Sequence, residues 1–264
     1  MPTLLGIPFD GNSSYLRGAA GAPPKIREAL RCESSNSWTE LGVDLGGPDA
    51  YADAGDLGLS DQRSAFATIE SAVEDLLKKR ERPLSLGGDH SITYPIMRAF
   101  AQRYSELTII QFDAHPDLYD EFEGSRVSHA CPFARIVEEK LARRLVQIGI
   151  RTMNRHCREQ AARFGVEVVE MCELPAHQRL KLGGPVYISF DMDVLDPAFA
   201  PGISHREAGG MTVREAISHL HAVEGTIVGA DVVEFNPVRD VSGLTAIAAA
   251  KIVKEILGRM TAQN

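Results

Sequence analysis

The segment LTIIQFDAHPD (residues 107–117) decides the interpretation of this sequence. Its first six residues are apolar at almost every position, so a strand here would be buried on both faces. Parallel strands that helices cover on both sides have this composition. The polar residues Asp113, His115 and Asp117 follow at once. The segment therefore predicts a buried strand that ends at a polar site.

The same pattern recurs along the chain and predicts seven strands separated by amphipathic segments. These strands are Leu4–Pro8, Pro83–Gly87, Leu107–Asp113, Leu145–Ile150, Val166–Glu170, Val186–Asp191 and Ile227–Phe235. Strands that alternate with helices favour an open α/β sheet, mostly parallel. A polar region between Ser34 and Gly58 is predicted to be a long loop. We find no repeat or linker, so residues 1–264 are expected to form one domain.

Helix starts are marked by proline and by capping residues. The expected helices are Lys25–Arg31, a segment that Ser60-Asp61 opens and that runs to Arg80, Val213–His221, and a last helix from Ser242 to about Met260. Pro23 and Pro24 suit the first turn of a helix. Thr212 followed three residues later by Glu215 predicts a capping box.

The composition fits a soluble globular protein and excludes several other classes. The 264 residues are 44% hydrophobic, enough to bury a core. The formal charge of -8 lacks the basic surface that nucleic-acid binding requires. No apolar run is long enough to span a bilayer, and the first residues lack the basic start of a signal peptide. We therefore expect a cytoplasmic protein with neither nucleic-acid nor membrane partners.

Four polar clusters each follow a predicted strand. They are GGDHS (87–91), DAHPD (113–117), DMD (191–193) and EFNP (234–237). In open α/β sheets, ligands bind in the crevice beyond the carboxyl ends of the strands. The four clusters are therefore expected to converge on one site.

The residue types in these clusters indicate a metal centre. The candidate ligands are His90, Asp113, His115, Asp117, Asp191 and Asp193. Four crowded carboxylates cannot all stay ionised without cations to compensate them. Two divalent ions would balance the charge, and carboxylate with imidazole suits Mn2+, with Fe, Co, Ni or Zn as alternatives. Such a pair of ions lowers the pKa of a bound water.

Each cluster taken alone has a simpler explanation. Asp191 and Asp193 would ordinarily form a turn or a cap, Asp89 could orient His90 or cap the next helix, and Glu234 could belong to a buried ion pair. Four clusters that all follow strands are better explained by a shared site.

The motifs resemble those of the ureohydrolases, the arginase and agmatinase superfamily. GGDHS, DAHPD and SFDMDVLDP (189–197) match the signatures of that family in order and spacing. NSSYLRG (12–18), SHACPFARI (128–136) and GADVVEFNP (229–237) look most like plant-type arginases and their bacterial relatives. The resemblance implies a three-layer α/β/α fold with a mostly parallel central sheet, and hydrolysis of a guanidino compound to urea and an amine.

The resemblance also assigns the metal ligands. His90 and Asp117 match ligands of one manganese ion, and His115 and Asp193 match ligands of the other. Asp113 and Asp191 match carboxylates that bridge the two ions.

The catalytic roles follow from the same matches. Glu234 matches the glutamate that pairs with the guanidinium, and Asp117 is expected to accept a proton from the attacking hydroxide. His129 matches a histidine that transfers protons to the leaving amine. Because His129 precedes a helix that starts near Pro132, we expect its ring to be neutral.

The substrate is less defined than the reaction. His205 stands where a threonine often lines the guanidinium pocket, so it is either a pocket residue or a structural histidine. Arg126 either binds a substrate carboxylate or is a solvated loop arginine. Agmatine is slightly favoured over arginine, and guanidinobutyrate, guanidinopropionate and formiminoglutamate are alternatives. A non-catalytic metal-binding homologue is the alternative from another class. The resemblance further implies a homotrimer or homohexamer.

Overall fold

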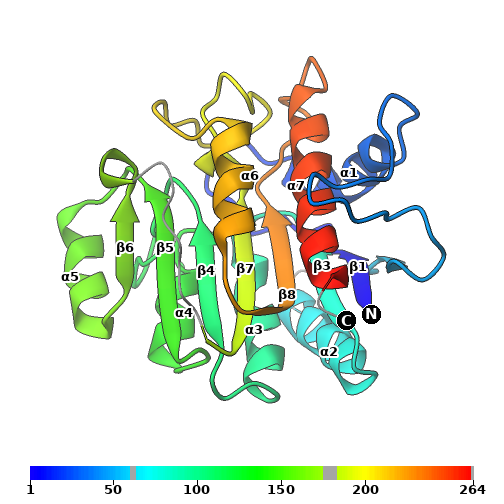
Figure 1. Cartoon of the computed structure of the whole chain (residues 1–264). Coiled ribbons are helices and arrows are strands. Elements are labelled where there is room, and N and C mark those ends of the chain that lie inside the picture. The colour runs from blue at the N-terminus through cyan, green and yellow to red at the C-terminus, as the bar shows by residue number, and fades with distance from the viewer. Residues whose placement is uncertain (60–63, 175–182, 263–264) are drawn as a thin grey trace.

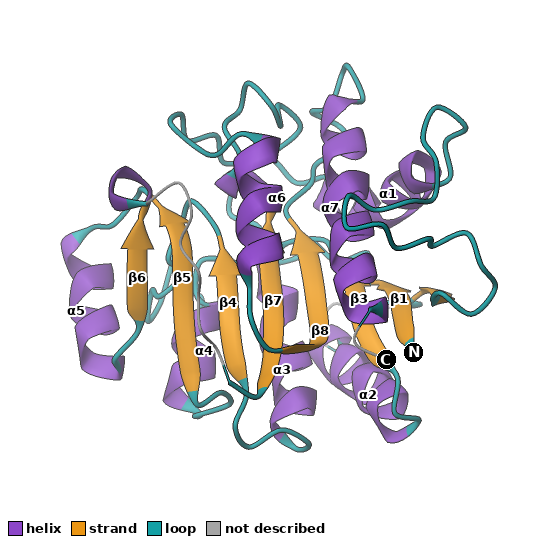
Figure 2. Ribbon diagram, viewed as in Figure 1, coloured by secondary structure: helices purple, strands orange, loops and turns teal. Residues whose placement is uncertain are grey.

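A computed structural model describes residues 1–59, 64–174 and 183–262, and a single eight-stranded sheet forms its centre (Figures 1 and 2). The strand order is β2-β1-β3-β8-β7-β4-β5-β6, and all seven pairings are parallel. The strands are β1 (Pro2–Gly6), β2 (Ala52–Asp56), β3 (Arg82–Leu86), β4 (Thr108–Phe112), β5 (Arg144–Ile150), β6 (Glu167–Glu170), β7 (Pro185–Asp191) and β8 (Thr226–Val233).

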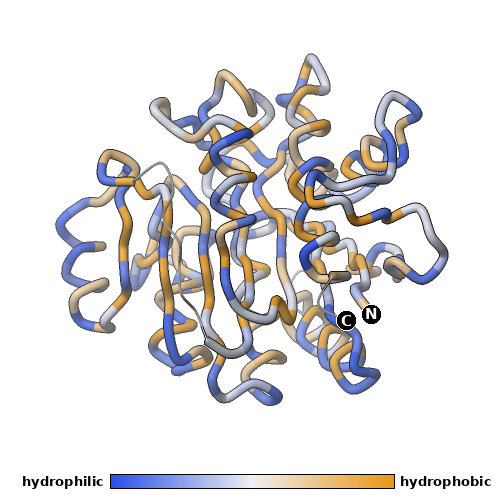
Figure 3. Tube along the Cα trace, viewed as in Figure 1, coloured by the Kyte–Doolittle hydropathy of each residue, from blue (hydrophilic) through white to orange (hydrophobic). Residues whose placement is uncertain are grey.

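Helices cover both faces of this sheet. They are α1 (Ala22–Leu30), α2 (Ala65–Lys78), α3 (Thr93–Ala101), α4 (Pro132–Glu138), α5 (Arg155–Phe164), α6 (Val213–Ala222) and α7 (Leu244–Thr261). The apolar sides of α1, α6 and α7 pack into one core, and those of α2, α3, α4 and α5 pack into the other. Figure 3 shows hydrophobic residues along the central strands and a largely hydrophilic α5 at the edge. The predicted three-layer α/β/α fold is confirmed.

The edge strand β2 corrects the sequence analysis, which predicted a loop from Ser34 to Gly58. Its sequence, ADAGD, has no apolar alternation, and three of its five residues are exposed. The strand exists because it pairs with β1, from Thr3↔Ala52 onward. A pairing that is made with a distant segment leaves no local signal in such a polar stretch.

The helix boundaries agree with the sequence patterns in part. Thr212 and Glu215 form the predicted capping box at the start of α6. The last helix begins at Leu244 rather than at Ser242, because Gly243 caps it in a left-handed conformation, with φ of 71°. The predicted helix start at Ser60-Asp61 lies outside the described residues. Among the helices that are described, none has the length and hydropathy to cross a membrane.

The order of the strands positions the site. The four polar clusters follow β3, β8, β7 and β4, and these are consecutive neighbours in the sheet. Gly88 lets the first cluster pack directly against the backbone of Phe9, because a Cβ at this position would lie 1.6 Å from the Phe9 carbonyl oxygen. The carboxyl edge of four adjacent strands thus brings the clusters together.

Candidate active site

His90 occupies the centre of the first group of candidate ligands. It begins a short 3-10 turn after β3 and is fully buried. Its Nδ1 lies 3.1 Å from Oδ2 of Asp113, 3.0 Å from Oδ2 of Asp117 and 3.2 Å from Oδ2 of Asp191. Residues from β3, β4 and β7 therefore direct one imidazole nitrogen and three carboxylate oxygens at the same point.

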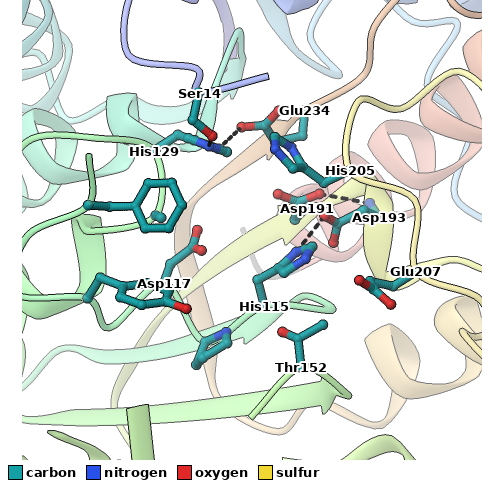
Figure 4. A pocket seen from close by; sticks show the side chains of 14 residues that line it. Ser14, His115, Asp117, His129, Thr152, Asp191, Asp193, His205, Glu207 and Glu234 are labelled. Atoms are coloured by element: carbon teal, nitrogen blue, oxygen red, sulfur yellow. Dashed lines mark hydrogen bonds and ion pairs between the residues drawn. The ribbon is translucent and has the colours of Figure 1, made fainter. Parts of the chain in front are cut away.

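His115 belongs to a second group beside the first. Its Nδ1 lies 2.8 Å from Oδ2 of Asp193 and 3.7 Å from Oδ1 of Asp113. Asp113 thus presents one oxygen to each imidazole, which is the arrangement expected of a bridging carboxylate. Asp191 joins the groups in another way, because its Oδ1 accepts a 2.7 Å hydrogen bond from the backbone nitrogen of Asp193. Figure 4 shows Asp191, Asp193 and His115 next to one another.

The donor set fits a pair of metal ions. His90 Nδ1 is buried and makes no hydrogen bond, although three carboxylate oxygens surround it. His90, Asp113 and Asp117 form one group of possible ligands, and Asp113, His115 and Asp193 form another. Cations among these atoms would satisfy the imidazole nitrogen and offset the carboxylate charges. The structure thus brings all six predicted ligands together.

The pKa values of these groups show that their charges are unfavourable when no cation is present. Burial, together with the charge of Asp113, raises the pKa of Asp117 to about 6. Burial and the charges of Asp193 and Asp113 raise the pKa of Asp191 well above its usual value. Burial lowers the pKa of His90, but its carboxylate partners outweigh burial and raise it. The cluster therefore retains protons unless positive charge is supplied.

Two residues of the site have positive φ angles, a backbone conformation that residues other than glycine rarely adopt. Asp117 has φ of 48° and Glu234 has φ of 62°. Such conformations cost free energy and persist where the surrounding structure enforces them. The backbone nitrogen of Glu234 is held by the carbonyl of Gly88, at 2.9 Å. This conformation turns the chain at the end of β8, where Glu234 enters the site.

Glu234 and His129 form a pair beside the ligand cluster. Glu234 Oε1 accepts a 2.9 Å hydrogen bond from the backbone nitrogen of His90 and lies 3.1 Å from His129 Nδ1. The other ring nitrogen of His129 lies 2.8 Å from the hydroxyl of Ser14 (Figure 4). Glu234, a candidate for binding the substrate, is thereby held against the segment that contains the candidate metal ligand His90.

The structure favours a protonated His129 over the neutral ring expected from its position before a helix. Burial lowers the pKa of this ring, but the hydrogen bond and charge of Glu234 outweigh burial and raise the pKa to about 9. His129 precedes α4 as predicted, but Cys131 is the residue that caps that helix. A carboxylate at 3.1 Å outweighs the helix terminus, and the ring is charged at neutral pH.

A cavity of about 230 Å³ is lined by His129, Glu234 and four of the six candidate ligands, which are His115, Asp117, Asp191 and Asp193. His205 is part of its wall, and its ring lies 4.8 Å from that of His129 and 6.1 Å from that of His115. Burial, and then the charge of His129, lowers the pKa of His205. The structure therefore supports the pocket interpretation of His205, with a neutral ring at the site.

Arg126 does not reach the cavity in the described structure, which argues against its proposed role in binding a carboxylate. Its guanidinium pairs with Asp120 and lies 3.0 Å from Glu138. The loop therefore uses this arginine to hold α4. Asp89 also has a structural role, because its carboxylate accepts hydrogen bonds from the backbone nitrogens of Ser91 and Asn12.

Several cavity residues were not identified from the sequence. They are Ser14, Pro116, Tyr119, Phe122, Ala130, Thr152 and Glu207. Ser14, Pro116 and Ala130 lie within the segments NSSYLRG, DAHPD and SHACPFARI that were quoted for their resemblance, so those segments were the available signal.

The fold and the ligand cluster define an α/β protein with a candidate paired metal centre at the carboxyl edge of its sheet. Comparison with known proteins is more specific. Residues 2–258 match the arginase family, and the chain belongs to that family. It is an arginase-family ureohydrolase, an enzyme of the class that cleaves guanidino compounds to urea, as the motifs implied.

Individual relatives include both arginases and agmatinases. The chain is 49% identical to arginase 1, mitochondrial, of Arabidopsis thaliana, covering 98% of this chain and 81% of that protein. It is 36% identical to an agmatinase of Bacillus cereus, and the match covers 96% of this chain and 90% of that protein. The solved structure of an arginase from Medicago truncatula superposes with a TM-score of 0.92 at 42% identity, covering 98% of this chain and 87% of that one.

The predicted cytoplasmic location is wrong by this comparison. Similar plant arginases are named as mitochondrial, and one as chloroplastic or mitochondrial. The prediction used only composition and the first residues, and neither separates the cytoplasm from an organelle.

Proposed function

We propose that this chain is a manganese-dependent ureohydrolase that acts on a guanidino compound carrying an amine at its far end, with arginine as the first candidate. The observation that carries the proposal is the cavity itself, which Glu234 lines together with four of the six candidate metal ligands, while its carboxylate accepts a hydrogen bond from the backbone of a fifth, His90. Arginine is placed first because the chain is 49% identical to a plant arginase and 36% identical to an agmatinase. This order reverses the slight preference for agmatine drawn from the motifs.

Glu234 would bind the guanidinium. Both hydrogen bonds described for this carboxylate go to Oε1, so Oε2 is available to a guanidinium N–H. A charged hydrogen bond of this kind, buried from water, is among the stronger polar contacts. It would hold the guanidinium carbon beside the ligand cluster.

Two manganese ions held by the six ligands would supply Lewis acidity and a water with a lowered pKa. Asp117 lies at the edge of this cluster and lines the cavity, so its carboxylate is placed to take a proton as the guanidinium carbon is attacked. His129, charged at neutral pH, would hold the proton that the leaving amine requires. The products would be urea and a primary amine.

The rest of the cavity favours a cationic far end on the substrate. Among the described residues that line it there is no lysine or arginine, whereas Glu207 adds a carboxylate at an exposed position. Guanidinobutyrate, guanidinopropionate and formiminoglutamate have a carboxylate and no free amine at the far end, so they would place a negative charge near Glu207 with no lysine or arginine of the described wall to pair with it. Agmatine has the amine without the carboxylate, so this lining suits it at least as well as arginine, and arginine is placed first on sequence identity alone.

The remaining expectations from the sequence are kept as proposals. Residues 1–264 would act as one domain, and the protein would assemble as a homotrimer or homohexamer, on the family resemblance alone. A non-catalytic homologue is disfavoured because none of the six ligands is replaced.

Urea release tests the proposed function. Protein that has been stripped with a chelator and reloaded with Mn2+ is incubated with arginine, agmatine, guanidinobutyrate and guanidinopropionate. We expect Mn2+-dependent release of urea from arginine or agmatine and little from the two acids. Release that is equal with and without Mn2+ would contradict the role of the metal, and preference for an acid would contradict the substrate class.

A further inference from the structure

A buried carboxylate that the proposed function does not use lies directly behind one of the metal ligands. Asp231 is on β8, and its register partner on β7 is Ser189. Both side chains are fully buried. Partners in register present their side chains on the same face of the sheet, and Ser189 Oγ donates a 2.7 Å hydrogen bond to Asp231 Oδ1.

Asp231 is surrounded by hydroxyl donors. Besides Ser189, the hydroxyl of Tyr187 donates to its Oδ2 at 2.8 Å, and that of Thr93 donates at 2.9 Å. Each hydroxyl has a single proton, and an ionised carboxylate only accepts hydrogen bonds. The hydroxyl proton of Ser189 is therefore used in the hydrogen bond to Asp231 and cannot also be donated to another acceptor.

The use of this proton decides the direction of the next hydrogen bond. Ser189 Oγ lies 2.9 Å from Nε2 of His90. Because the serine proton points to Asp231, the serine oxygen accepts, and Nε2 of His90 must carry a hydrogen. In the neutral ring Nδ1 is then unprotonated, and its lone pair faces the oxygens of Asp113, Asp117 and Asp191.

We propose that Asp231 and Ser189 are positioning residues that orient His90 and keep its Nδ1 free to bind a metal ion. Partners of this kind, behind a ligating histidine, fix the ring orientation and the nitrogen that ligates. The proposal concerns the metal centre and not the identity of the substrate. It holds whichever guanidino compound is hydrolysed.

The effect should be confined to one of the two metal positions. Ser189, whose hydroxyl donates to Asp231, contacts His90, and His90 belongs to the group formed with Asp113 and Asp117. His115 belongs to the other group, where its Nδ1 lies against Asp193. Loss of the pair should weaken one ion and spare the other.

Metal binding tests this proposal without a measurement of activity. Asp231→Asn replaces one acceptor oxygen with an amide that can donate, so the serine proton can turn toward His90 and shift the ring hydrogen to Nδ1. Ser189→Ala removes the link altogether. Titration of Mn2+ against a chelator, followed by metal analysis, should show one ion bound about 10–100-fold more weakly in both variants. The second ion should bind as in the wild type.

Tyr187→Phe is the matched control, because it removes a hydrogen bond to the same carboxylate but leaves the contact between Ser189 and His90. We expect both ions to bind to it within about threefold of wild type. Wild-type affinities in Asp231→Asn and Ser189→Ala would overturn the proposal. Equal weakening of both ions, or weakening in Tyr187→Phe as large as in Ser189→Ala, would also overturn it, because these results indicate a general structural effect.

Discussion

The backbone nitrogen of His90 donates a 2.9 Å hydrogen bond to Oε1 of Glu234, although the two residues are 144 positions apart in the chain. The metal-ligand segment after β3 and the substrate-binding candidate after β8 are therefore one rigid unit. Adjacent strands allow this contact, because β3 and β8 pair through Leu84↔Ala230 to Leu86↔Val232. A substitution at Glu234 must therefore keep an acceptor for this hydrogen bond if the metal ligands are to stay in place.

Glu234→Gln should lose substrate binding and keep the metal. The amide oxygen can still accept from the backbone nitrogen of His90, but the charge that faces the guanidinium is gone. Loss of one partner of a buried charged pair costs about 2–5 kcal/mol, so kcat/KM should fall by roughly 30-fold or more. Steady-state kinetics and metal analysis of the same preparation check this. An unchanged KM and kcat would remove the role assigned to Glu234.

Asp191→Ala should abolish urea release and lower the metal content. Its Oδ2 lies 3.2 Å from His90 Nδ1, and its Oδ1 orders the backbone of Asp193, so the substitution affects both groups of ligands. We expect fewer than two Mn2+ per chain after dialysis, and a lower unfolding temperature in Mn2+ because a ligand that binds only the folded state stabilises it. Full activity with one ion or none would refute the paired centre.

His129 should make the reaction depend on pH in the alkaline range. Its pKa is raised to about 9, so the ring is protonated at pH 7 and loses its proton as the pH rises through 9. If this proton goes to the leaving amine, kcat should fall above about pH 9. His129→Gln should be slower throughout, by about 10²–10⁴-fold, and lack this decline. A decline that persists in the variant would assign it to another group.

The ligands were predictable because each follows an apolar run that ends abruptly in charge. His90, Asp113 and Asp191 carry that signal in their immediate neighbours. The charge state of His129 could not be predicted from its neighbours in the sequence, because it depends on Glu234, 105 positions away. The same holds for Arg126, whose partners Asp120 and Glu138 are fixed by the packing of α4, and for β2, which exists only through its pairing with β1.

Glu207→Gln should change how the enzyme treats the far end of its substrate. Glu207 lies in the loop after β7, and Arg151 Nη2 donates to its carbonyl at 2.7 Å and to the carbonyl of Asp193 at 2.6 Å. Arg151 thereby fixes the Glu207 loop to the metal-ligand turn, and the Glu207 side chain lines the cavity (Figure 4). A carboxylate at this partly solvated position should contribute about 1 kcal/mol to binding an ammonium, or roughly fivefold in KM.

We therefore expect KM for agmatine to rise about fivefold in the Glu207→Gln variant, with kcat and metal content unchanged. Butylguanidine, which lacks the amine, is the matched control, and its KM should be the same for both proteins. Equal increases for the two compounds would mean that Glu207 supports the loop and does not recognise the amine.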